Sequence, residues 1–113
     1  MKLFNKTKNT VLAESLNLAD TPLKRMRGLL GKKEMKIGQA LMLKPCNSIH
    51  TLFMSFPIDV IFVNKANRVI KAIHSLRPFR LTPIYFHASF VIELPPGTLK
   101  TKNTSCDDEI SIE

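Results

Sequence analysis

The sequence predicts an α+β, mainly β fold: a small, single-domain, mostly antiparallel β-barrel with one short helix in its N-terminal half. The chain has 113 residues, the length of one domain, so residues 1–113 are treated as a single unit. Short segments rich in valine, isoleucine, phenylalanine and threonine recur along it, as strands favour. Only one segment has helical periodicity, and a barrel protects the edges of many short strands.

The N-terminal half contains the first predicted strand and the helix. Residues 1–9 are expected to be loosely ordered, and residues 10–18 alternate as a strand does. Asp20-Thr21-Pro22 then combines capping side chains with a proline at the first helical position. Apolar residues follow at three- and four-residue spacing as far as Gly31, a suitable left-handed cap. We therefore predict a helix of about ten residues.

The second half of the chain is predicted to be strands joined by turns. The strand candidates are residues 39–43, 48–56, 58–63, 68–74, 84–94 and 109–112. Pro57 has no amide hydrogen for a ladder and marks an edge, a bulge or a bend. Asn64–Asn67 predicts a hairpin turn, and Pro95-Pro96-Gly97 predicts a second turn.

Positive charge dominates most of the chain. Four of the nine acidic residues lie in the last seven positions, which leaves residues 1–106 with a net charge of +12. Such a field attracts nucleic acid or an anionic surface, although it also serves solubility. The residues predicted for an anion-binding surface are Lys24, Arg25, Arg27, Lys32, Lys33, Arg77 and Arg80.

The cysteines and the N-terminus point to a reducing compartment. Cys46 and Cys106 are too few for a disulfide framework, and whether they pair is left open. No apolar run reaches the 18 residues of a spanning helix. The N-terminus has no signal-peptide pattern, so we expect a cytoplasmic protein.

Three segments resemble the DUF192 family, a domain of unknown function. They are Arg25–Gly31, Cys46–Val63 and Glu93–Gly97, and the resemblance covers about residues 10–112. It implies a small β-rich barrel with a helix near the start. It attaches no enzymatic activity to the family as a whole. Family members are often exported, but the N-terminus of this chain has no signal-peptide pattern, so export is not expected here.

The chain departs from the family pattern at two positions. Pro96 stands where the family turn usually has alanine, and Cys106-Asp107 stands where a glycine usually precedes the aspartate. If that glycine serves a positive φ, a cysteine there is strained or the turn differs.

Four polar residues are the candidate ligand-binding site: Ser48, His50, Asp59 and Glu93. Asp59 and Glu93 are isolated acids within apolar strands, and an unpaired buried charge is very unfavourable. One hypothesis is that they form buried hydrogen bonds or ion pairs that fix the strand register. The other is that all four converge at the barrel mouth on a small ligand.

Metal binding and catalysis are weighed against strand geometry. Cys46 and His50 would lie about 13 Å apart on one strand, too far to share an ion, so we predict no metal and no cofactor. Ser48, His50 and Asp59 supply the residue types of a catalytic triad. Their placement on a strand is poor for a nucleophile–base hydrogen bond.

We therefore favour a non-enzymatic β-barrel module with no assignable activity, whose partner is a small ligand or a protein. The first alternative is a binder of nucleic acid or an anionic surface. The second alternative is a small hydrolase.

Overall fold

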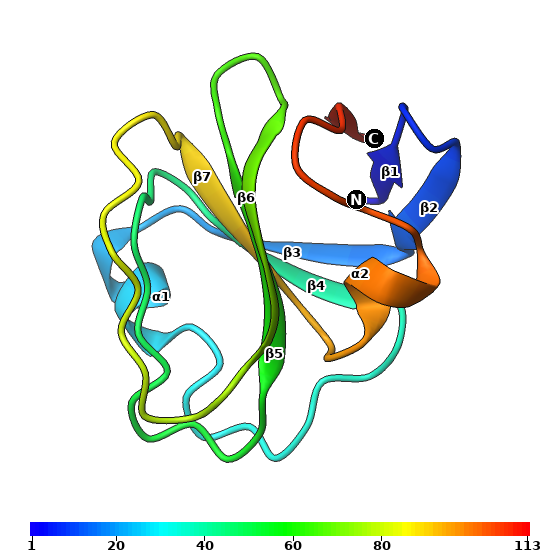
Figure 1. Ribbon diagram of the computed structural model, residues 1–113. Coiled ribbons are helices and arrows are strands. Elements are labelled where there is room, and N and C mark those ends of the chain that lie inside the picture. The colour runs from blue at the N-terminus through cyan, green and yellow to red at the C-terminus, as the bar shows by residue number, and fades with distance from the viewer.

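The computed structural model describes residues 1–113 as eight strands and two short helices. The strands are β1 (Leu3–Asn5), β2 (Thr10–Ala13), β3 (Ser15–Ala19), β4 (Gln39–Leu43), β5 (Ile58–Val63), β6 (Val69–Leu76), β7 (Phe90–Leu94) and β8 (Ile110–Ile112). The helices are α1 (Pro22–Arg27) and α2 (Thr98–Thr101). Strands β3-β4-β7-β5-β6 form a large sheet and β2-β1-β8 a small one (Figure 1).

The large sheet is built around β5 and β7. Every residue of these two strands is buried, which fits their runs of valine, isoleucine and phenylalanine. Their neighbours pair antiparallel, and only β3 and β4 pair parallel. Because parallel strands need a crossover connection, the segment between them leaves the sheet, and α1 lies in that segment.

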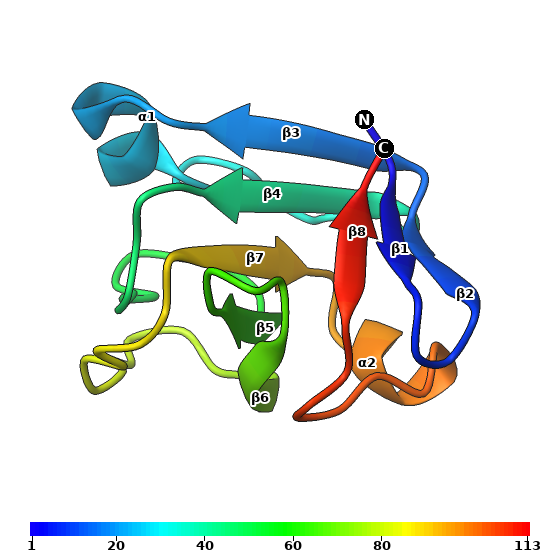
Figure 2. The same cartoon turned by 90° about the horizontal axis from the view of Figure 1, so that it is seen from above.

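Two apolar clusters lie on opposite faces of the large sheet. One lies between the two sheets and includes Leu3, Ile61, Ile92 and Leu99. The other includes Val60, Phe62 and Val91 and is covered by long loops instead of a sheet. Figure 2 shows the small sheet and α2 at one end, away from α1. The molecule therefore has a small-sheet end and a loop end, the latter made of α1 and residues 46–57 and 77–89 (Figure 1).

The mainly β, single-domain prediction is confirmed, but the closed barrel is not. The pairings form two sheets, with β3 and β6 as the outer strands of the large one. The predicted strands 39–43 and 58–63 match β4 and β5, and residues 68–74 fall almost wholly within β6. The predicted strand over 10–18 is divided into β2 and β3, which belong to different sheets.

Residues 1–9 are not loosely ordered. β1 is the central strand of the small sheet, and Leu3 and Asn5 are fully buried. The Asn5 amide donates to Thr104 Oγ1 and to Asp108 Oδ2, both at 2.9 Å. Burial raises the pKa of Asp108, but hydrogen bonds from Asn5, Ser105 and Lys8, with the Lys8 charge, lower it overall. These bonds tie the N-terminus to the C-terminal segment.

Residues 48–56 do not form the predicted strand. Their one ladder contact is an isolated bridge between His50 and Leu81. The buried Thr51 hydroxyl instead bonds to backbone groups of Arg77 and Arg80, and such side-chain bonds compete with a ladder. Phe53 then turns the chain at a φ of 66°. The predicted strand over 84–94 is likewise reduced to β7.

The helix is shorter than predicted because Gly28, at a φ of 47°, ends it. Leu23 and Met26 of the predicted apolar stripe are exposed, whereas Leu29 beyond the helix is buried. The sequence departs from the family pattern at Cys106-Asp107, where a glycine usually precedes the aspartate. In the structure the positive φ there falls on Asp107 (75°) and not on Cys106. Neither helix is long or apolar enough to cross a bilayer.

Candidate functional site

A pocket of about 100 Å³ lies at the loop end of the large sheet. Its walls come from α1 and the residues just after it, from the loop that follows β4, and from β7. Apolar side chains line about half of it, among them Leu29, Ile49 and Met54. This volume holds several water molecules or a small organic group. The site is therefore suited to a small, partly apolar ligand.

Glu93 is the buried polar group of this pocket. The residue is 4% exposed, and its carboxyl oxygens bond to no protein group but stay accessible from the pocket. Desolvation by burial raises its pKa to about 8, so the carboxyl is mostly protonated at neutral pH. A neutral carboxyl both donates and accepts a hydrogen bond. Glu93 thus offers a ligand a two-sided polar contact inside an apolar site.

Cys46 lines the same pocket, but its thiol is not activated. Burial raises the thiol pKa, and Glu93 adds to this effect in its ionised form. A backbone hydrogen bond at Ser48 and the Arg25 charge act in the opposite direction without cancelling it. The sulfur lies 3.1 Å from the Ser48 carbonyl oxygen, to which the thiol donates. Because the thiolate is the nucleophile, this cysteine is poorly placed for covalent catalysis.

Ser48 and His50 also line the pocket, as the ligand-site hypothesis requires. Their side chains do not hydrogen-bond to each other, and His50 is exposed. Because this segment is a loop, the strand distances that separated Cys46 from His50 do not apply. The chain nevertheless gathers no group of three or more histidine, cysteine or acidic side chains that could hold a metal ion.

Asp59 does not belong to the pocket. It is fully buried on the opposite face of the large sheet, where Oδ1 accepts from the Ser75 amide at 2.8 Å. Oδ2 accepts from the Leu99 amide of α2 at 2.9 Å. The carboxylate therefore joins β6 to α2. With Asp59 on this face, Ser48, His50 and Asp59 do not come together as a catalytic triad.

The predicted basic residues gather at the loop end. Arg25 and Arg27 line the Glu93 pocket, and Arg77 and Arg80 lie on the loop that bonds to Thr51. None of the seven predicted residues forms an ion pair. The ion pairs involve Lys2, Lys6, Lys8 and Arg68 with acids near the small sheet. All four ion pairs therefore lie near the small sheet, and none involves the predicted anion-binding residues.

Leu29 and Met54 belong to this pocket but were not predicted as site residues, and Arg25 was predicted only for the anion-binding surface. All three reach the pocket because α1 is short and residues 48–56 loop back. The two exposed phenylalanines, Phe53 and Phe79, stack edge to face, a contact that the sequence does not predict. The sequence signal for these exposed loops was the presence of apolar residues next to Pro57 and Pro78. The positive φ values that turn Phe53 and Phe79 outward cannot be predicted from the residue type.

The fold is found in solved structures. A protein of unknown function from Novosphingobium aromaticivorans matches with a TM-score of 0.84 and 18% identity, covering 98% of this chain and 82% of that one. A candidate transcription regulator from Sinorhizobium meliloti matches with a TM-score of 0.82 and 17% identity, covering 97% and 89%. At these identities the likeness establishes the fold alone.

Sequence relatives extend the comparison to the whole chain. A UPF0127 protein of Thermococcus sibiricus is 34% identical over 115 residues, covering 98% of this chain and 74% of the relative. A UPF0127 protein of Pyrococcus horikoshii is 31% identical over 111 residues, covering 96% of each. The DUF192 family model, described as "Uncharacterized ACR", matches residues 3–112. The chain therefore belongs to the DUF192 family.

Proposed function

We propose that the chain is a non-enzymatic binding module whose pocket takes a small ligand with an uncharged hydrogen-bonding end at Glu93. One observation carries the proposal: the Glu93 carboxyl is buried, has no protein partner and lines an open pocket. A carboxyl that is largely desolvated and has no protein hydrogen bond keeps only the bonds available from the pocket. A ligand in the pocket would supply hydrogen bonds at these oxygens.

The chemistry of the pocket favours a short carboxamide or carboxylic acid. A protonated carboxyl presents a donor and an acceptor side by side, and both ligand classes present the complementary pair. Leu29, Ile49 and Met54 favour an apolar remainder. Arg25 at the pocket wall would favour the ionised form of an acid, so the carboxamide is the ligand class that keeps the uncharged end proposed here.

The four polar residues of the original hypothesis then divide into two roles. Ser48, His50 and Glu93 are proposed to serve the ligand, because they line one pocket. Asp59 is proposed to serve the fold, because its two oxygens are already bonded to backbone amides. This division keeps both hypotheses for the polar cluster, the ligand site and the structural hydrogen bonds, but assigns them to different residues.

The test is an amide NMR titration of the intact protein with propionamide and propionic acid as probes. We expect shifts at Ser48, His50 and Cys46, and loss of these shifts in Glu93→Leu. Glu34→Leu makes the same change at an exposed position and is the matched control. Glu93→Leu should melt no lower than the unsubstituted protein, because it replaces an unpartnered polar group with an apolar one.

Two outcomes would overturn the proposal. One is the absence of shifts with both probes. The other is shifts of the same size in Glu93→Leu, which would show that the carboxyl does not hold the ligand. His50→Ala gives a second check, since it should weaken probe binding without lowering the melting temperature of a protein in which His50 is exposed.

A further inference from the structure

We propose that the loop end of the molecule docks on the surface of a bilayer that contains anionic phospholipids. The proposal rests on exposed side chains of α1 and of residues 46–57 and 77–89. It does not depend on the Glu93 pocket or on any ligand bound there.

The first observation is the concentration of exposed apolar side chains at this end. Eight of the ten large apolar residues that the structure exposes belong to it: Leu23, Met26, Leu52, Phe53, Phe79, Leu81, Ile84 and Phe86. Phe86 is 82% exposed and Phe53 77%. Large apolar areas on a protein surface usually mark an interaction site.

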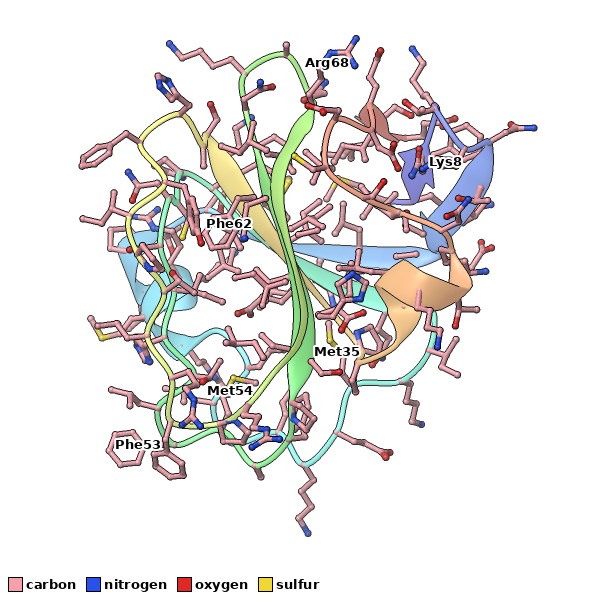
Figure 3. The ribbon with its side chains drawn as sticks, in the orientation of Figure 1. Lys8, Met35, Phe53, Met54, Phe62 and Arg68 are labelled. Atoms are coloured by element: carbon pink, nitrogen blue, oxygen red, sulfur yellow. The ribbon has the colours of Figure 1, made fainter.

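The second observation is that the backbone holds two phenylalanines outward. Phe53 and Phe79 have φ values of 66° and 60°, a strained region for a bulky residue. The Thr51 amide donates to the Arg80 carbonyl, and the Thr51 carbonyl accepts from the Phe79 amide, both at 2.9 Å. The two rings lie edge to face, 6.1 Å between centroids. Figure 3 shows Phe53 at the outer edge of the molecule, whereas Phe62 lies inside.

The third observation is the charge around these rings. Arg77 and Arg80 flank Phe79, and neither forms an ion pair. The Ser55 hydroxyl donates to the Lys32 carbonyl at 3.1 Å, which joins the basic segment after α1 to the Phe53 loop. Exposed rings bordered by unpaired lysine and arginine are the composition of interfacial membrane binding.

The same observations favour lipid over nucleic acid. Single-stranded nucleic acid needs flat aromatic faces, but five of the eight exposed apolar residues are aliphatic. Phe53 and Phe79 also cover part of each other, and Tyr85 is packed against Phe62 with 4.4 Å between ring centroids. Acyl chains accept aliphatic and aromatic side chains alike. A bilayer therefore accepts every residue type in the set, whereas stacked bases would use only its three phenylalanines.

The test is co-sedimentation of the intact protein with two kinds of vesicle: phosphatidylcholine alone, and phosphatidylcholine mixed with phosphatidylserine. We expect binding to the mixed vesicles that weakens as salt increases. Phe53→Ser with Phe79→Ser should lower the partition coefficient about tenfold, because the inserted apolar area is lost. Ile37→Ser is the matched control, since it removes an apolar side chain that is 91% exposed elsewhere.

A charge variant tests the second half of the proposal. Arg77→Ser with Arg80→Ser should lower the partition coefficient about thirtyfold, which corresponds to ~1 kcal/mol for each charge near an anionic surface. Lys71→Ser with Lys100→Ser removes two exposed charges outside the loop end and should change the partition coefficient little.

Several results would overturn the proposal. They are no binding to the mixed vesicles, equal binding to both vesicle types, or binding unchanged by the paired phenylalanine substitutions. Preference for single-stranded RNA over vesicles in a competition assay would assign the face to nucleic acid. A dimer that buries Phe53 in solution would assign it to a second copy of the chain. Thermal melting of each variant confirms that loss of binding is not loss of folding.

Discussion

Asp59 and Glu93 lie on adjacent strands but face opposite sides of the large sheet. The register pairs Asp59 with Leu94 and Val60 with Glu93. Because successive side chains alternate faces, Asp59 lies with the cluster between the sheets and Glu93 with the loop-covered cluster. The two buried acids therefore have different structural environments. One is bonded to the backbone, and the other lines a pocket.

The first prediction concerns Asp59. Replacing it with asparagine leaves one oxygen to serve two backbone amides, those of Ser75 and Leu99. We expect Asp59→Asn to lower the free energy of unfolding by about 3 kcal/mol, because one buried donor loses its partner. Urea unfolding measures this. Asp107→Asn makes the same change at an exposed acid and should be nearly neutral. Equal effects from the two substitutions would contradict the assigned role.

The second prediction is a pH dependence caused by Glu93. Its pKa is about 8 in the folded protein, against a model-compound value of 4.5. Between these values the unfolded chain has released the proton and the folded chain retains it. Stability should therefore fall as pH rises from 4.5 to 8, with a slope approaching ~1.4 kcal/mol per pH unit from this group.

Glu93→Gln removes the titrating group, so this part of the pH dependence should disappear. Urea unfolding at a series of pH values tests the prediction for both proteins. A stability curve with the same slope in Glu93→Gln would assign the dependence to other groups.

The third prediction concerns Thr51, which supports the Phe53 and Phe79 loops. Thr51→Val keeps the shape but removes the hydroxyl that accepts from the Arg80 amide at 2.9 Å. We expect a loss of about 1–3 kcal/mol in stability, because a buried donor is left unsatisfied. Hydrogen exchange at the Arg80 amide should quicken. Thr101→Val makes the same change at an exposed position and is the control. If the Arg80 amide exchanged faster in Thr101→Val but not in Thr51→Val, the role assigned to Thr51 would be wrong.

The fourth prediction separates the two cysteines. Cys46 is half-buried and its thiol pKa is raised, first by burial, whereas Cys106 is exposed. Alkylation with iodoacetamide near neutral pH should therefore modify Cys106 first, because both access and the thiolate population are reduced at Cys46. Mass spectrometry of Cys46→Ser and Cys106→Ser variants measures each rate. Faster labelling of Cys46 would show that its thiol is activated after all.

Strands dominated by apolar residues were predictable, and loops held by buried polar side chains were not. Residues 39–43 and 58–63 form β4 and β5 as predicted, although Gln39 and Asp59 bond through their side chains to backbone outside these strands. Residues 48–56 have comparable β propensity, but Thr51 bonds across to residues 77–80 and two phenylalanines adopt positive φ. Such long-range bonds depend on the tertiary structure, so residue type does not reveal them.

The candidate site was predictable in composition but not in grouping. Ser48, His50 and Glu93 were identified from their polarity in an apolar context, and they share the pocket. Asp59 was identified by the same criterion but lies on the other face. The register of β5 against β7 decides which face of the sheet each acid occupies. A register shift of one residue would move every side chain of a strand to the opposite face.

The most direct test of the account is the titration of the Glu93 carboxyl itself, followed by carbon NMR of the side-chain carboxyl and assigned through Glu93→Gln. The account predicts a midpoint near pH 8, as expected for a buried carboxyl without a partner. A midpoint near 4.5 would contradict it, because the carboxyl would then be solvated or paired with a cation.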